Sequence, residues 1–191
     1  ALGRGCGPIL IHKHKLNFKQ PENIRIAIPG YFTTANLLLS IYLPFLKNKK
    51  EMLFSEIEDA ILNNTVDAGI IIHENRFTYQ EKKLKKITDL GEVWEKDTGL
   101  PIPLGCIAAR RSFNKEMLYK ISRVIKRSIM YAYSNPFDVM PFIKHHAQQT
   151  DDLVIRKHID LYVNGNSFDL SWDARNAIKT LAGKLAQNEE I

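Results

Sequence analysis

The stretch "NIRIAIPGYFTTANLLLSIY", residues 23–42, carries the pattern that decides the fold. Its first part alternates and then becomes apolar up to residues 29–30, a Pro-Gly pair, which predicts a strand that ends in a turn. Thr33 or Thr34 is placed to cap a following helix, and three consecutive leucines give that helix a broad apolar face. Pro44 is expected to end the helix.

The next residues repeat this order of elements. "EMLFS" (51–55) predicts a short strand, and "EIEDAILNN" (56–64) predicts a helix for which Ser55 is the candidate cap. "DAGIIIH" (67–73) predicts a second strong strand. The order strand, helix, strand, helix, strand predicts an α/β fold with a largely parallel sheet.

The second half of the chain is expected to change character. "ITDLG" (87–91) and "GCIAAR" (105–110) are interpreted as further strands, and the pattern is helical from about Asn114 onward. The expected helices cover residues 115–134, 136–149, 151–162 and 171–186.

Proline and glycine near residues 20–23 and 99–105 suggest two crossings between lobes. We expect residues 1–20 and 105–191 to form lobe I, with a helical C-terminal part. Residues 21–104 are expected to form lobe II as an inserted α/β unit.

Composition limits the classes of function. The 191 residues are 45% hydrophobic and 25% charged, an ordinary globular balance. The net charge of +6 comes from dispersed lysines, with runs at 46–50 and 81–86 that lack interleaved aromatics, so a nucleic-acid partner is not expected. The positive excess favours small acidic ligands instead.

The two cysteines and the longest apolar run bear on location. Cys6 and Cys106 are far apart and form no CxxC or Cys/His group, so we expect packing cysteines, no metal and a reducing compartment. The apolar stretch 33–46 is shorter than the roughly 20 residues that cross a bilayer, so a soluble protein without a membrane partner is expected.

Two segments predict a ligand site. "PGYFTTA" (29–35) and "IIIH" (70–73) both follow predicted strands, and ligands of open α/β sheets gather at the carboxyl ends of the strands. The first segment offers free N–H groups at a helix start, a seat for a carboxylate or phosphate, although plain capping explains it too. At the second, His73 leaves the strand where a ligand would lie, and an imidazole with its ordinary pKa of about 6.5 suits a general base.

Other candidate motifs are weaker. The glycines of "GRGCG" (3–7) do not have phosphate-loop spacing, and a flexible or closely packed connector explains them better. His12 and His14 fall on one face of an extended segment but lack a third ligand, so an exposed strand end is favoured over a metal site. The adjacent His145 and His146 are interpreted as surface or capping groups.

The chain closely resembles the 1,4-dihydroxy-6-naphthoate synthase family of the futalosine route to menaquinone. Four motifs carry the resemblance in this order: "GRGCGP" (3–8), "PGYFTTA" (29–35), "DAGIIIHENRFTYQ" (67–80) and "TGLPIPLG" (98–105). The resemblance spans nearly the whole chain, and the His-Glu-x-Arg-x-Thr-Tyr run is its most specific part.

The resemblance implies a two-lobed α/β fold like that of type 2 periplasmic binding proteins, used as a cytoplasmic lyase without a cofactor. It implies cleavage of cyclic dehypoxanthine futalosine to 1,4-dihydroxy-6-naphthoate, with a small aromatic carboxylate as the bound partner. His73 resembles the family's proton acceptor, and Thr34 with Ala35 resembles its substrate-binding pair. Glu74 is a candidate to orient the imidazole, or to form an exposed salt bridge with Arg76 or a lysine.

One departure and two alternatives stay open. Family members carry an N-terminal segment before the "GRGCGP" run, so we expect the N-terminal part of one lobe, and one wall of the pocket, to be missing. The first alternative is a non-catalytic protein of the same fold that binds a small carboxylate. The second is the sibling enzyme chorismate dehydratase, which the His-Glu-x-Arg run disfavours.

Overall fold

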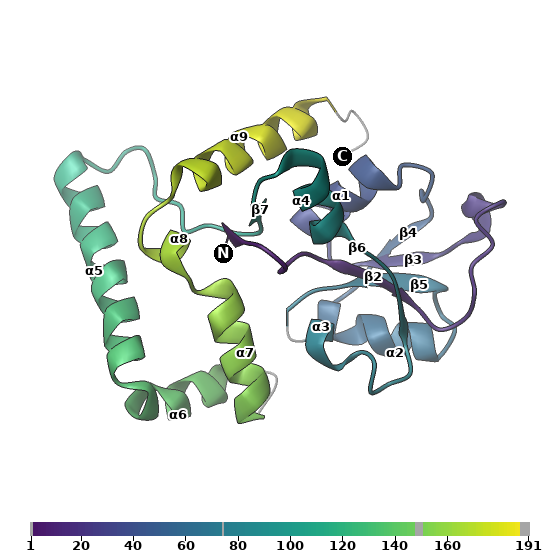
Figure 1. The fold of residues 1–191 in the computed structure, drawn as a ribbon, viewed down its shortest axis with the longest axis horizontal. Helices are drawn as coiled ribbons and strands as arrows, with labels where there is room; N and C mark the ends of the chain where they lie inside the picture. Colours follow the sequence, from purple (N-terminus) through teal and green to yellow (C-terminus); the bar gives the residue numbers. More distant parts are fainter. Residues whose placement is uncertain (1, 74, 148–150, 188–191) are drawn as a thin grey trace.

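A five-stranded sheet in the order β4-β3-β5-β2-β6 organises the structure, a computed structural model that describes residues 2–73, 75–147 and 151–187 (Figure 1). The strands are β1 (Leu2–Gly3), β2 (Ile9–His12), β3 (Ile26–Ile28), β4 (Lys49–Glu51), β5 (Ala68–Ile71), β6 (Lys85–Asp89) and β7 (Ile102–Pro103). The helices are α1 (Thr34–Tyr42), α2 (Ile57–Leu62), α3 (Asn75–Thr78), α4 (Leu90–Thr98), α5 (Lys115–Ser134), α6 (Pro136–His146), α7 (Asp152–Tyr162), α8 (Gly165–Phe168) and α9 (Trp172–Ala186). Short 3-10 turns η1 (Pro21–Asn23) and η2 (Phe54–Glu56) complete the described elements.

The three strands expected from the alternation of strand and helix pair in parallel, but the sheet as a whole is mixed. β3 pairs in parallel with both β4 and β5, while β2 runs antiparallel to its two neighbours β5 and β6. β2 is therefore the one strand of this sheet that runs against the others. A second, two-stranded sheet pairs β1 with β7 in antiparallel fashion.

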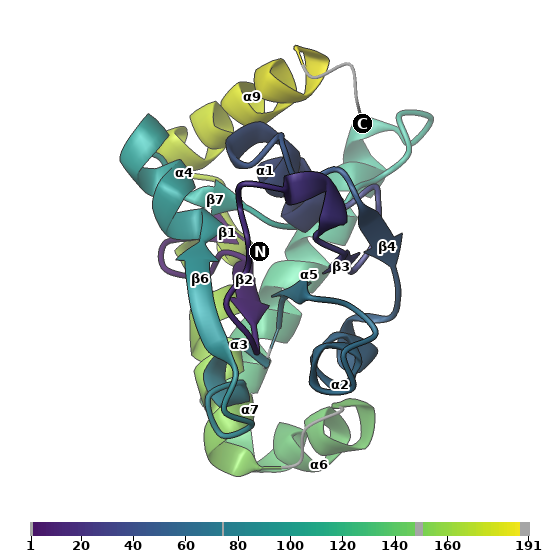
Figure 2. The same ribbon diagram turned by 90° about the vertical axis from the view of Figure 1, so that its right-hand side faces the viewer.

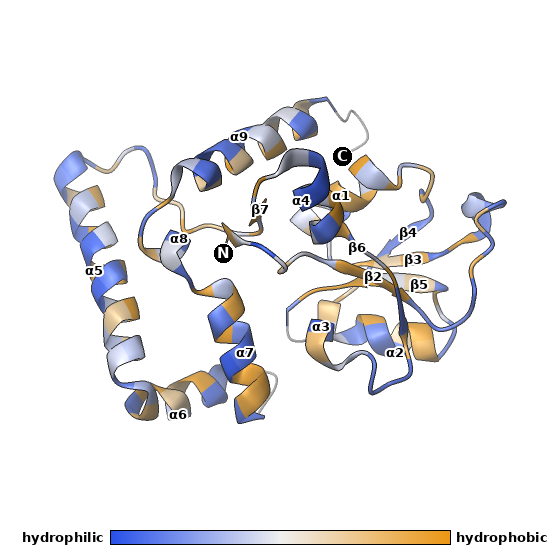
Figure 3. Cartoon of the chain, in the orientation of Figure 1, coloured by the Kyte–Doolittle hydropathy of each residue, from blue (hydrophilic) through white to orange (hydrophobic). Residues whose placement is uncertain are grey.

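Each face of the five-stranded sheet packs against its own helices, because side chains alternate along a strand. Leu10, Ile26 and Ile70 lie in one buried cluster with residues of α1, α4 and α9. Ile9 and Ile11 point to the other face, into a cluster with residues of α2. Figures 2 and 3 show the two layers of helices and the hydrophobic strands between them. We call the five strands with α1, α2 and α4 the sheet unit.

The C-terminal helices agree with the expected pattern. α5 covers residues 115–134 as predicted, and α6, α7 and α9 begin within one residue of their predicted starts. None of the residues of α5 or α6 is buried, and these helices stand away from the sheet unit in Figure 1, with α7 nearer to the strands. α9 instead returns to the sheet unit, where its Ala174 and Ala177 are fully buried beside Trp94.

Three expectations about strands and caps were wrong. The strand predicted at 51–55 lies at Lys49–Glu51, and Ser55 falls inside η2. No side-chain hydrogen bond caps α2, whose N-cap position is Glu56. The strand predicted at 105–110 is absent, and residues 105–110 are exposed, because the chain pairs with β1 earlier, at β7.

The strand predicted at 87–91 ends sooner than expected. β6 stops at Asp89, whose carboxylate accepts hydrogen bonds from the N–H groups of Gly91 and Glu92 at 2.8 and 3.1 Å. An aspartate in this position is a strong helix cap, so Leu90 and Gly91 begin α4 instead of continuing the strand.

The lobe boundaries need one change. β2 lies between β5 and β6 in the sheet unit, although residues 1–20 were expected in lobe I. The division into two lobes remains a proposal, with β2 assigned to lobe II. None of the described helices is both long and apolar enough to cross a bilayer.

Candidate functional site

The two segments singled out in the sequence leave the same edge of the sheet. β3 and β5 are parallel neighbours, with Ile26 paired to Ala68, so their carboxyl ends lie side by side. The loop before α1 follows β3, and His73 follows β5. The topology therefore brings the two predicted halves of the site together, as expected for ligand sites of open α/β sheets.

The first half is the start of α1. Thr33 is the N-cap: its hydroxyl accepts from the N–H of Asn36 at 3.2 Å and donates to the carbonyl of Gly30 at 2.7 Å. The cap satisfies the third N–H of the helix, and the first two have no acceptor within a helix. These belong to Thr34 and Ala35, the residues predicted to bind substrate.

The side chains of Thr34 and Ala35 offer a ligand less than their backbone N–H groups do. Ala35 is 3% exposed, so its methyl group packs in the core. The half-buried Thr34 hydroxyl donates to the carbonyl of Leu104 at 3.4 Å, which joins α1 to the segment after β7. Ligand binding here would therefore use N–H groups, and the chemistry suits an anion.

His73 forms the second half of the site. It is exposed, and its φ of 56° lies in the left-handed region. Such a conformation costs about 1–3 kcal/mol in a non-glycine residue and is frequent at functional sites.

Three aromatic rings, those of Phe54, His158 and Tyr162, lie near this imidazole. The centroid of the His73 ring lies 4.9 Å from Phe54, 5.8 Å from His158 and 6.4 Å from Tyr162. Phe54 follows β4, so the contact joins the segments after β4 and β5, the strands that flank β3. His73 thus follows the strand next to β3, whose carboxyl end starts the loop before α1.

Arg76 anchors the turn that follows His73. Its guanidinium donates to the carbonyl of Gly7 and lies 3.3 Å from a carboxylate oxygen of Asp89. The pair is largely buried, with side chains 10% and 4% exposed. Burial raises the pKa of Asp89, although Arg76 and the two N–H donors of α4 oppose that rise.

A neighbouring contact fixes α7 to the same segment. The Tyr162 hydroxyl donates to the carbonyl of Cys6 at 3.4 Å, next to the carbonyl that Arg76 binds. Burial raises the pKa of Tyr162, so the phenol stays a neutral donor. Burial likewise raises the pKa of the Cys6 thiol to about 11.

The sequence missed part of this site. Phe54, His158 and Tyr162 were not singled out, although His158 and Tyr162 stand four apart on a predicted helix and so share one face. Glu74, the candidate partner of His73, lies outside the described residues. Arg76 pairs with Asp89, and the predicted role of Glu74 beside His73 or Arg76 stays a prediction.

The weaker candidates behave as surface or packing groups. Gly7 is closely packed, in agreement with the connector interpretation of the glycine run. The His12 ring lies 2.6 Å from the carbonyl oxygen of His14, at the exposed end of β2. His145 and His146 are exposed in the last turn of α6, with ring centroids 4.9 Å apart.

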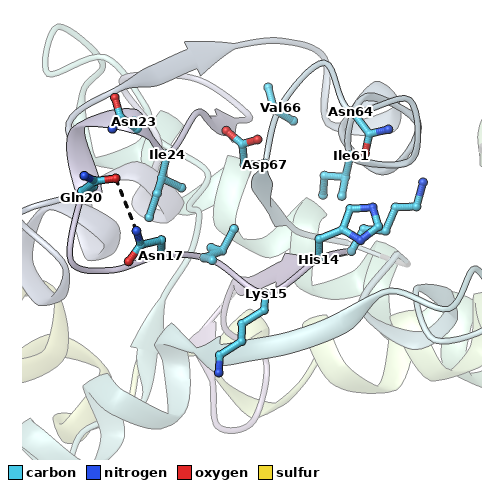
Figure 4. A pocket seen from close by; sticks show the side chains of 12 residues that line it. His14, Lys15, Asn17, Gln20, Asn23, Ile24, Ile61, Asn64, Val66 and Asp67 are labelled. Carbon is cyan, nitrogen blue, oxygen red and sulfur yellow. Dashed lines mark hydrogen bonds between the residues drawn. The ribbon is translucent and has the colours of Figure 1, made fainter.

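A pocket of about 200 Å³ lies elsewhere on the sheet unit (Figure 4). Its lining includes Ile24 and Asp67, which precede β3 and β5, and His14, which follows the antiparallel β2. All three positions belong to the amino edge of β3 and β5. The pocket is therefore at the opposite edge from Thr34 and His73.

Comparison with known proteins identifies relatives over almost the whole chain. A family model described as menaquinone biosynthesis matches residues 1–187. The chain is 38% identical over 181 residues to 1,4-dihydroxy-6-naphthoate synthase of Thermus thermophilus, covering 95% of this chain and 65% of the relative. It is 39% identical over 194 residues to the Streptomyces coelicolor protein of that name, covering 97% and 67%. The chain thus spans about two thirds of the length of these curated relatives.

Solved structures agree on the fold. Protein AF1704 from Archaeoglobus fulgidus matches with a TM-score of 0.91 and 31% identity, over 100% of this chain and 71% of that one. An ABC transporter structure from Parabacteroides distasonis matches with a TM-score of 0.60, 16% identity and coverages of 99% and 67%. The periplasmic aliphatic sulphonate binding protein of Escherichia coli matches with a TM-score of 0.50 and 11% identity, over 95% of this chain and 64% of that one. These matches confirm an α/β fold of the periplasmic-binding-protein type.

Proposed function

The chain belongs to the menaquinone biosynthesis family, and from that premise we propose that it acts as a 1,4-dihydroxy-6-naphthoate synthase. Two relatives at 38% and 39% identity bear this name and support the proposal. The reaction is the cleavage of cyclic dehypoxanthine futalosine to 1,4-dihydroxy-6-naphthoate and a sugar-derived fragment, without a cofactor. Because the relatives are named for a biosynthetic step, we also propose that the protein works in the cytoplasm.

In this proposal the start of α1 binds the aromatic carboxylate of the substrate. The N–H groups of Thr34 and Ala35 donate to the carboxylate, and the positive end of the helix dipole adds to the attraction. The buried side chain of Ala35 keeps the backbone close to the ligand, since a larger group would meet the core. The carboxylate thereby fixes the position of the fused rings relative to β3.

His73 acts as the general base. His73 is exposed and follows β5, the strand next to β3, and in this proposal its imidazole faces the carboxylate-anchored substrate. Removal of a proton by the neutral imidazole begins the elimination that releases the sugar-derived fragment. The substrate and the base then approach each other from neighbouring strands, which brings the reacting groups together.

The single observation that carries this proposal is the parallel pairing of β3 with β5. Because of this pairing, the start of α1 and His73 follow adjacent strand ends, which supports a proposal that uses both. A small-carboxylate-binding protein would need the first group only, and the likeness to transporter components shows the fold alone. An exposed histidine in a strained backbone conformation favours the enzyme.

The deciding experiment offers the purified protein cyclic dehypoxanthine futalosine and, separately, chorismate. Product identification by mass should show 1,4-dihydroxy-6-naphthoate from the first substrate and no reaction of the second. Conversion of chorismate would assign the sibling dehydratase activity. Binding of the naphthoate without conversion of either substrate would leave a non-catalytic binding protein and refute the lyase proposal.

A further inference from the structure

His73 is an exposed residue at the end of a strand, yet its ring is held on more than one side. Phe54 contacts it from the segment after β4, and His158 contacts it from α7. The His73 and His158 rings are nearly perpendicular, at 69°, the edge-to-face geometry that aromatic pairs prefer. α7 belongs to the helical part of the chain, outside the sheet unit.

His158 is itself held in place by a second ring. Its centroid lies 4.7 Å from that of Tyr162, and the two planes are perpendicular at 90°. The residues are four apart on α7, so their side chains lie on the same face of the helix. Ile155, one turn before His158 and 5% exposed, packs this face into the protein.

The carbonyl groups of Cys6 and Gly7 hold the two segments that bring His73 and His158 together. The Cys6 carbonyl accepts from Tyr162, which lies one turn after His158 on α7. The Gly7 carbonyl accepts from Arg76, three residues after His73. The turn that bears His73 and the helix that bears His158 are therefore tied to neighbouring peptide groups, and their separation is set by one short segment.

We propose that His158 is a positioning residue that holds the His73 ring in the orientation that proton removal requires. This inference rests on the proposed function, which identifies His73 as the base. It attributes the orientation of the His73 ring to packing against a ring of α7. A general base must lie within hydrogen-bonding reach of the proton it removes, so a freely rotating imidazole would lose efficiency. His158 supplies this restraint from α7, in the helical part of the chain.

Two variants of His158 separate ring packing from its other roles. Because a displacement of about 1 Å can cost on the order of 100-fold in rate, His158→Ala should lower kcat by about 10- to 100-fold. KM should change little, since the carboxylate is bound at α1. His158→Phe keeps an aromatic ring of similar shape and should restore kcat to within about 3-fold of the wild-type value.

A double-mutant cycle tests whether His158 acts through His73. In a His73→Ala background, His158→Ala should have no further effect on the residual rate, because the ring that it positions is gone. An equal loss in both backgrounds, or a kcat for His158→Phe as low as that for His158→Ala, would overturn the proposal. A KM effect without a kcat effect would overturn it as well.

A chemical measurement tests the positioning independently of turnover. Carbethoxylation of each histidine, followed by peptide mass mapping, should be faster at His73 in His158→Ala and unchanged in His158→Phe. The exposed His14 serves as the internal reference in every sample. An unchanged rate at His73 in His158→Ala would refute the positioning role, whereas a wild-type protein that converts neither substrate would refute only the proposed function.

Discussion

Gly7 and Gly91 are in direct backbone contact, because a Cβ atom added to Gly7 would lie 2.3 Å from the Cα of Gly91. The same test on Gly91 places the added atom 2.6 Å from the Cα of Gly7. Gly7 carries the carbonyl that binds Arg76, and Gly91 lies in the first turn of α4. The contact thus joins the segment before β2 to the helix that Asp89 caps.

Gly7→Ala should be strongly destabilising. The atoms that the new methyl group meets belong to the backbone, so no side chain can rotate away, and overpacking of this kind costs about 3 kcal/mol. Urea unfolding monitored by circular dichroism measures the change. Gly183→Ala is the matched control: it lies in α9 with open space around it, and alanine should stabilise the helix by about 0.5–1 kcal/mol. Equal stability of Gly7→Ala and wild type would contradict the close contact.

His73→Ala should reduce turnover to a small residual rate while the naphthoate product still binds. The substitution removes the proposed base but leaves the N–H groups of α1 untouched, so product affinity should stay within about 3-fold of wild type. Steady-state kinetics and product titration give the two values. Turnover at the wild-type rate would show that another group removes the proton, and loss of product binding would show that His73 serves the ligand and not the chemistry.

Thr34→Pro should weaken binding of the carboxylate without harming the helix. Proline fits the first position of a helix, and the extended conformation of Thr33 is compatible with a following proline. The variant lacks the Thr34 N–H, and a hydrogen bond to a charged group contributes about 1.5–3 kcal/mol, or roughly 10- to 100-fold in affinity. Thr34→Val loses only the hydroxyl and is the control. If the two variants bind the naphthoate equally, the N–H does not contact the carboxylate.

The two cysteines should react at very different rates. Burial raises the pKa of the Cys6 thiol to about 11, so the reactive thiolate is scarce at neutral pH, and Cys106 is exposed. Iodoacetamide followed by peptide mapping should label Cys106 rapidly and Cys6 only after unfolding. Comparable labelling of both in the folded protein would mean that the segment containing Cys6 opens readily.

Local patterns predicted the site's two halves but not what surrounds them. The strand and turn at 23–30, the helix that Thr33 caps and the apolar strand before His73 all follow from spacing of a few residues. The place of β2 depends on pairing with β5 and β6, which lie more than 50 residues away and leave no local signal. The contact of His158 with His73 spans a similar distance in sequence, so helix periodicity gives its face but not its partner.

Arg76→Met should cost about 3–5 kcal/mol of unfolding free energy, since it leaves the carboxylate of Asp89 buried without its partner. Lys120→Met, which breaks the exposed pair of α5 between Lys120 and Glu116, should change stability by no more than about 0.5 kcal/mol. Chemical unfolding of both variants at neutral pH makes the comparison. A loss as small for Arg76→Met as for Lys120→Met would contradict the buried pair.

The stability of Arg76→Met should also depend on pH in a defined direction. Burial raises the pKa of Asp89 above its ordinary value, so the folded state holds the proton more tightly than the unfolded state does. That contribution is present below the ordinary carboxylate pKa and is lost as pH rises through the raised value. Arg76 opposes the rise, so Arg76→Met should lose stability more steeply than wild type as pH increases above the ordinary carboxylate pKa. Adding Asp89→Asn, which keeps an oxygen to cap α4, should remove the extra slope, and a slope that persists would assign it to another group.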